Sequence, residues 1–318
     1  MKTDLSNSRG VYASLTNDYM FKKIFGCEES KDILLTFLNH IIGHGDILDV
    51  SFLNTENLGP TSEDRKVIFD VAVRTNSNEE YRIEMQLAKQ DFFRDRALFY
   101  SCYPVINQGE LAKQKYIQEH GSSAGFKWNF RLNPVRLIAI VDFTMEHAQE
   151  WDASRYHSSY RLHEDSTGEL LHDKLQYVFL ELGRFNKSED ELDGYYDKWM
   201  YLFKNMSNLE SRPETFKEKI FDSLFTKADF ANFTPQEFRK YQEATKMISD
   251  YENCIDYARK EGREEGLAAG VLKGRKEGRE EGAAAKAVET AKNFKAKGID
   301  SKIIAECTGL TIEQVAQL

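Results

Sequence analysis

The chain has 318 residues and a formal net charge of −9 at pH 7, from 52 acidic and 43 basic side chains. Its length gives room for about two domains, and an apolar content of 41% excludes a chain that stays unfolded for lack of apolar surface. The acidic excess disfavours non-specific DNA binding, and no apolar run approaches the roughly 18 residues that span a membrane.

The first residues and the cysteines indicate a cytoplasmic protein. The segment from Met1 to Asn7 is polar and lacks the apolar core of a signal peptide. The cysteines are scattered, with no Cys-x-x-Cys pair, at Cys27, Cys102, Cys254 and Cys307. We therefore expect reduced thiols and no structural zinc.

Residues 16–43 predict a short helix followed by a longer one. Ser30 stands where an N-cap would begin the second helix, and apolar residues at helical spacing give that helix one buried face: Ile33, Leu34, Phe37, Leu38, Ile41 and Ile42. Residues 47–58 then fit a first strand.

Two further strands are expected at 67–73 and 81–87, because both segments alternate apolar and polar residues. Asn76-Ser77-Asn78 supplies the turn between them. This hairpin brings Asp70 and Glu84 to facing points of adjacent strands, where two carboxylates would repel. A divalent cation is one reason to hold them together; carboxylates at a solvent-facing edge are the alternative.

The strand period adds a polar pocket to this hypothesis. Glu84 and Gln86 share one face of their strand, and Lys66 shares a face with Asp70. Lys66 would therefore reach the same pocket or lie at a solvated edge. Mg²⁺ suits such a site, because it binds few protein carboxylates and keeps positions open for water and phosphate oxygens.

The next elements are a helix over 92–114, a loop over 117–131 and a strand over 137–143. Arg96 and Tyr100 lie one turn apart on the helix, so both would point at the site or pack on each other at the surface. The nearly continuous apolar run of the strand is typical of a strand buried on both faces.

From about residue 150 the pattern changes. A strand is expected over 174–182 and a helix over 189–205, whose aromatic residues are typical of a core. Thr234-Pro235-Gln236-Glu237 predicts a helix start with a capping box. That helix would continue through Ile255 into the tail.

The tail contains an internal repeat, since residues 259–266 recur letter for letter at 275–282. Glycine stands at every fourth residue from Gly262 to Gly282, and each helical glycine costs about 1 kcal/mol relative to alanine. We expect a partly helical connector that packs on a partner or on a second copy; a disordered charged linker is the alternative. Residues 298–318 predict two short helices, with a capping box at Thr311, that suit a small docking module better than a DNA-reading one.

The ordered series of motifs resembles the recombination-promoting nuclease and transposase family of the PD-(D/E)XK nuclease superfamily. The matching segments run from Asn17 to Gly26, Phe69 to Val71, Ile83 to Gln86, Arg96 to Tyr100 and Pro134 to Phe143, followed by the glycine-punctuated tail. The resemblance implies an α/β fold with a core of α-β-β-β-α-β order, in which a mixed sheet is flanked by helices, followed by a mainly helical C-terminal region.

The resemblance also implies a metal site and a substrate. Asp70, Glu84 and the backbone carbonyl of Met85 would bind Mg²⁺, with Mn²⁺ or Ca²⁺ as alternatives. Gln86 occupies the position of the superfamily's usual lysine, which is a departure because glutamine carries no positive charge. Lys66 is a candidate for that charge, and Asp18 for a further acid or a part of a helix start. The candidate DNA contacts are Lys22, Arg94, Arg96 and Tyr100.

We therefore expect a metal-dependent DNA endonuclease linked to recombination or mobile elements. A non-catalytic relative that serves as an interaction or regulatory protein is the alternative, and a DNA-binding protein without cleavage would need more basic charge. The expected domains are a nuclease-like core (1–145), a mixed, mainly helical extension (146–255), the repeat connector (256–297) and the two-helix module (298–318).

Overall fold

A computed structural model describes residues 10–43, 47–57, 67–147, 151–152 and 154–318. It divides into two compact units, residues 1–245 and 246–318. The helices of the first unit are α1 (Asp18–Phe25), α2 (Lys31–Ile42), α3 (Phe93–His120), α4 (Gly194–Asn205) and α5 (Lys219–Ala228). Helix α6 (Pro235–Ala296) begins in the first unit and continues through the second, which ends with α7 (Ser301–Thr308) and α8 (Ile312–Gln317).

The first unit contains a six-stranded mixed sheet in the order β1-β4-β5-β6-β8-β7. The strands are β1 (Val50–Phe52), β4 (Val71–Thr75), β5 (Glu80–Gln86), β6 (Val135–Val141), β7 (His157–Tyr160) and β8 (Leu175–Glu181). Strands β5, β6 and β8 are parallel, and the other neighbours pair antiparallel. The expected mixed sheet flanked by helices is confirmed, and β6 is buried along its whole length as predicted.

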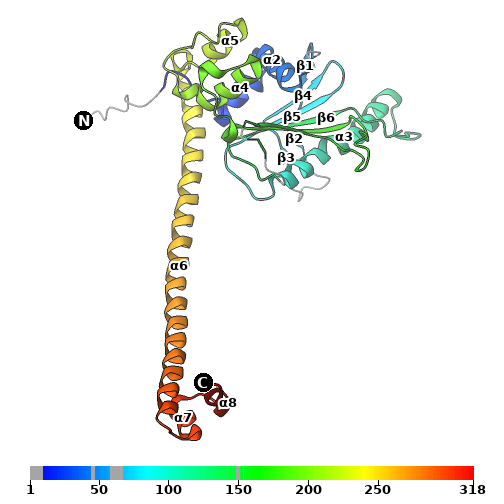
Figure 1. Ribbon diagram of the computed structural model, residues 1–318. Coiled ribbons are helices and arrows are strands. Elements are labelled where there is room, and N and C mark those ends of the chain that lie inside the picture. Colours follow the sequence, from blue (N-terminus) through cyan, green and yellow to red (C-terminus); the bar gives the residue numbers. More distant parts are fainter. Residues whose placement is uncertain (1–9, 44–46, 58–66, 148–150, 153) are drawn as a thin grey trace. The chain divides into compact units, whose positions relative to one another are not determined.

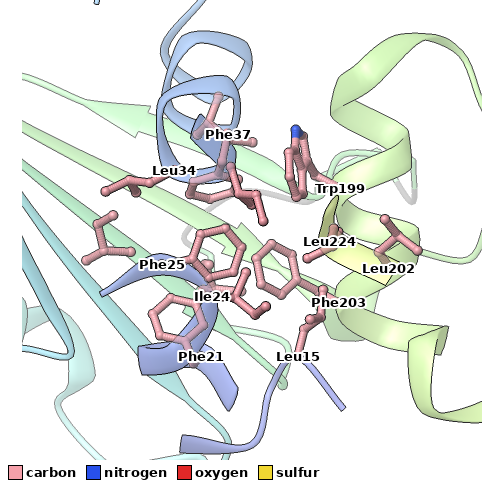
Figure 2. Close-up of a cluster of buried hydrophobic side chains, with 14 of the residues drawn as sticks. Leu15, Phe21, Ile24, Phe25, Leu34, Phe37, Trp199, Leu202, Phe203 and Leu224 are labelled. Atoms are coloured by element: carbon pink, nitrogen blue, oxygen red, sulfur yellow. The ribbon is translucent and has the colours of Figure 1, made fainter. Parts of the chain in front are cut away.

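Helices cover both faces of this sheet (Figure 1). On one face, α1, α2, α4 and α5 enclose a large apolar core with alternate residues of β4, β5, β6 and β8. Figure 2 shows the aromatic part of this core, in which Phe25 packs against Phe37, Trp199 and Phe203. On the opposite face, α3 packs through Phe93 and Ala97 on the other alternate set of sheet residues. The two-residue period of the strands thus assigns each side chain to one of two cores.

Two expected strands are interrupted. The segment 47–58 splits into β1 and β2 (Glu56–Asn57), and the segment 67–73 splits into β3 (Val67–Ile68) and β4, with Asp70 in the bend between them. The prediction of one continuous strand over 67–73 was wrong because β3 pairs with β2 in a separate two-stranded sheet. The shared face expected for Lys66 and Asp70 required a continuous strand, and Lys66 lies outside the described residues.

Helix α3 is longer than expected and extends into the segment assigned to a loop. It ends where Gly121 adopts a left-handed backbone (φ 74°) and donates its amide to the carbonyl of Ile117 at 2.7 Å, a conformation that glycine adopts without a steric penalty. Ser30 precedes α2 as expected but makes no capping bond there; its hydroxyl donates to the carbonyl of Lys23 at 3.1 Å.

The expected domain boundary at residue 145 falls inside the first compact unit. Strand β8 pairs with β6 along seven residues, and Trp199 and Phe203 of α4 lie in the same core as Phe25 of α1. The segment after residue 145 therefore completes the sheet and the core that the segment before it begins.

In the second unit, α6 is one continuous helix rather than the expected partly helical connector. Alanine, glutamate, lysine and arginine favour helix, and Lys273 pairs with Glu277 one turn further along at 3.8 Å. The two short terminal helices are present as predicted, and Thr311 forms its capping box with Gln314. Ile304 and Val315 pack with Ala291 at the end of α6, so these helices share a small core with it.

Candidate active site

Asp70 and Glu84 lie at the same point of the sheet, as the sequence predicts. In the β4–β5 pair, Val71 faces Ile83, and Asp70 and Glu84 are the next residues beyond that pair. The bend before β4 leaves Asp70 free of the regular ladder, so that its carboxylate accepts the backbone amide of Met85 at 2.8 Å. The backbone of β5, which carries Glu84, thus fixes the carboxylate of Asp70.

The carbonyl of Met85 points towards the same place. In an extended strand, the backbone amide and carbonyl of one residue point to the same edge of the strand. Those of the next residue point to the opposite edge. The amide of Met85 reaches Asp70, whereas the carbonyl of Gln86 accepts the amide of Asp142 at 3.0 Å beside β6. The backbone therefore presents the oxygen of Met85 on the side of Asp70.

Loss of hydration disfavours the ionised form of both carboxylates. Desolvation raises the pKa of Glu84 to about 7, Arg96 opposes this rise, and the charge of Asp70 adds to it. Desolvation also raises the pKa of Asp70, against the lowering by the Met85 amide and by Lys22. Two adjacent carboxylates with raised pKa values are a common feature of functional sites.

Each carboxylate has one cationic neighbour, delivered from opposite faces of the sheet. Lys22 of α1 lies 3.5 Å from Asp70 and 2.6 Å from Asp18. Arg96 of α3 lies 2.6 Å from Glu84. Asp18 therefore lies beside Lys22, and its charge raises the pKa of Asp70. Asn17, not Asp18, caps α1 by accepting the amide of Met20.

Arg96 also binds the amide side chains around the site. One terminal nitrogen donates to Gln86 at 3.4 Å and to Gln90. The guanidinium lies 4.7 Å from the ring centroid of Tyr100, one turn further along α3, as the predicted spacing implies. The amide nitrogen of Gln86 donates to the carbonyl of Ala88 at 3.0 Å, so that its oxygen faces Arg96.

The remaining candidate, Arg94, is directed elsewhere. It donates to the carbonyl of Glu146 at 2.6 Å and to His147 at 3.1 Å, and its guanidinium lies 5.9 Å from the ring centroid of Tyr160.

Sequence reasoning missed two features of this region. Gln90 belongs to none of the motifs found in the sequence, and its hydrogen bond with Arg96 forms only in the folded chain. The buried Glu181, which accepts His147 at 2.8 Å, ends β8 in the same row as Gln86 and Val141. A carboxylate at the end of an apolar run was the available signal, but the sequence did not show that this run lies parallel to β6.

The donor set suits a hard divalent cation. Two carboxylates and one backbone carbonyl converge, and oxygen donors of these types are the ligands of Mg²⁺ in proteins. Across the described ranges, no group of three or more His, Cys, Asp and Glu side chains gathers to hold a metal.

Comparison with known proteins agrees with this fold. Residues 15–258 match the family described as PD-(D/E)XK nuclease family transposase, a nuclease class whose members generally use divalent metal ions. This match covers more than half of the chain, so the protein belongs to that family, and the predicted resemblance is confirmed. No curated protein and no solved structure matches the chain. In the part of the chain that the structure describes, no helix is long and apolar enough to cross a membrane.

Proposed function

We propose that the protein is a divalent-metal-dependent DNA endonuclease that serves recombination or mobile elements. The single observation that carries this proposal is the proximity of the buried carboxylate of Glu84 to the partly buried carboxylate of Asp70 at the bend before β4. Buried like charges are costly unless something neutralises them. Membership of a nuclease family supplies the reaction class.

In this proposal Asp70, Glu84 and the carbonyl of Met85 hold Mg²⁺, with Mn²⁺ or Ca²⁺ as alternative ions. When bound, the ion supplies Lewis acidity that activates water and stabilises the transition state of phosphodiester cleavage. Gln86 orients the attacking water by a hydrogen bond, since its amide both donates and accepts. Lys22, Arg96 and Tyr100 line the approach of the DNA backbone.

The proposal is tested by nicking of supercoiled plasmid in Mg²⁺, Mn²⁺, Ca²⁺ or chelator. We expect metal-dependent nicking by the wild type and its loss in Asp70→Asn and Glu84→Gln, which keep the side-chain shape but remove the charge. Glu80→Gln is the matched control, because Glu80 is also a buried, ion-paired carboxylate of β5 but contacts Arg74 and Arg82 at the other end of the strand. Equal activity in all four proteins would reject the assignment.

Nicking that is absent in every metal, with no metal binding, would instead favour the non-catalytic alternative. In that case Lys22 and Arg96 would be permanent structural partners of the two carboxylates.

A further inference from the structure

The carboxylate of Glu84 already has a cation bound to it. Its Oε1 accepts Arg96 Nη2 at 2.6 Å, which is the short distance typical of a charge-assisted hydrogen bond. Glu84 is 6% exposed, so little space remains for a second cation while the guanidinium stays. A metal ion and a guanidinium on one buried carboxylate would also repel each other strongly.

Arg96 also has contacts with residues other than Glu84. Its guanidinium lies over the ring of Tyr100, and that ring is held by an edge-on contact with Phe69, at 5.8 Å between centroids. Gln86 and Gln90 offer neutral acceptors to Nη1, the terminal nitrogen that does not bind Glu84. The side chain therefore has contacts other than Glu84, and these would keep its guanidinium near the site after it leaves Glu84.

The charges around the two carboxylates indicate how the departure of Arg96 from Glu84 would affect the binding of DNA. The carboxylates of Asp18, Asp70 and Glu84 face only two cations, Lys22 and Arg96. These five groups carry a net charge of −1 when all are ionised, which disfavours the approach of DNA. A divalent cation would add two positive charges, which favours a phosphate at this point even on a protein with a net charge of −9.

We propose that Arg96 is bound to Glu84 only in the metal-free protein, that a divalent cation takes its place, and that the freed guanidinium binds the phosphate to be cleaved. Arg96 then supplies the positive charge that Gln86 cannot supply. A guanidinium is suited to this role because its fork of donors matches phosphate oxygens. This inference rests on the proposed function.

Lys22 does not have the same geometry. It lies 3.5 Å from Asp70 but 2.6 Å from Asp18, and its side chain is 45% exposed. A metal ion can therefore approach Asp70 while Lys22 remains paired with Asp18, so the proposal concerns Arg96 alone.

The first test measures the state of Arg96 in the unaltered full-length protein. Phenylglyoxal modifies free guanidinium groups, and mass spectrometry of peptides reports each arginine separately. We expect Ca²⁺ to increase the modification of Arg96 about tenfold, the factor that corresponds to releasing one charge-assisted hydrogen bond. Arg94 is the internal control, because its contacts are to Glu146 and His147 and should not respond.

The second test separates positioning from packing. Arg96→Gln should bind Mn²⁺ at least as tightly as the wild type in mildly alkaline buffer, measured by calorimetry, because the competing cation is gone. Its kcat for nicking should fall about 10²- to 10³-fold, as for the loss of one preorganised donor to a transition state. Arg96→Lys should recover part of kcat, and Arg74→Gln, which removes an arginine paired with the carboxylate of Glu80, should keep both the Mn²⁺ affinity and kcat.

The outcomes distinguish this inference from the proposed function. If calorimetry finds Mn²⁺ binding that Asp70→Asn abolishes, but Arg96 stays protected in Ca²⁺ or Arg96→Gln binds Mn²⁺ more weakly, the inference is overturned and the metal site stands. If the wild type binds no metal that depends on Asp70, both are overturned. Circular dichroism of each variant confirms that the protein is folded.

Discussion

Removing the charge of Glu84 should stabilise the metal-free protein, although it removes a partner of Arg96. Burial raises the pKa of Glu84 to about 7 from its ordinary 4.5. The folded state therefore binds more protons than the unfolded state between these two values, so stability is lost as the pH rises from 4.5 to about 7. At 1.36 kcal/mol for each pKa unit, the ionised carboxylate costs up to about 3 kcal/mol above pH 7.

Glu84→Gln avoids this cost because the amide is neutral at every pH. We expect the variant to gain up to about 3 kcal/mol of unfolding free energy over the wild type at pH 8 in chelator, and to gain nothing near pH 4. Urea unfolding followed by tryptophan fluorescence measures this difference for the first unit alone, because Trp128, Trp151 and Trp199 all lie there.

Saturating Mg²⁺ should make the wild type more stable than Glu84→Gln. A ligand present at about 1,000 times its Kd stabilises the folded state that binds it by about 4.1 kcal/mol, which exceeds the gain expected for Glu84→Gln, and only the wild type retains both carboxylates. Glu80→Gln controls for the loss of a buried carboxylate from β5, and it should show no such reversal. Equal stability of the wild type and Glu84→Gln at pH 8 in chelator would refute the argument that burial opposes ionisation of Glu84.

Three further predictions concern other parts of the chain. The Mg²⁺-dependent nicking rate should rise about tenfold per pH unit up to about pH 7, because Glu84 binds metal only when deprotonated; a flat profile between pH 5 and 7 would contradict this. Phe25→Ala should cost about 3–5 kcal/mol in urea unfolding, because Phe25 is fully buried among aromatic rings; a loss below 1 kcal/mol would show that the core closes over the gap. Truncation after Ile255 should leave the tryptophan unfolding transition unchanged while sedimentation shows a smaller assembly, since we propose that the exposed part of α6 binds a second copy or a partner protein; an unchanged assembly state would make it a plain linker.

Several features could be predicted because they depend on residues close in sequence. The alternation in β5 put Glu84 and Gln86 on one face, and Asn78 adopts the left-handed backbone (φ 63°) that the turn before β5 requires. Asp70 and Glu84 meet because a short hairpin joins them. The capping boxes at Thr234 and Thr311 formed because each needs only three following residues.

The bend at Asp70 and the segment after residue 145 were not predictable in this way. The bend depends on β2, which takes β3 into a second sheet. The role of β8 depends on its parallel pairing with β6, across more than thirty intervening residues. The sequence of either segment is equally compatible with other partners, because a strand pattern specifies faces and not neighbours.

The sequence by itself determined the candidate site residues, since the spacing of a carboxylate pair, an amide and an Arg-x-x-x-Tyr turn is set by the helical and strand periods. Only the tertiary structure decided that Lys22 and Arg96 neutralise that pair from opposite faces of the sheet. Their positions follow from how α1 and α3 pack on the two cores. Such packing sums many weak contacts between distant residues, whereas local spacing is fixed by the geometry of one element.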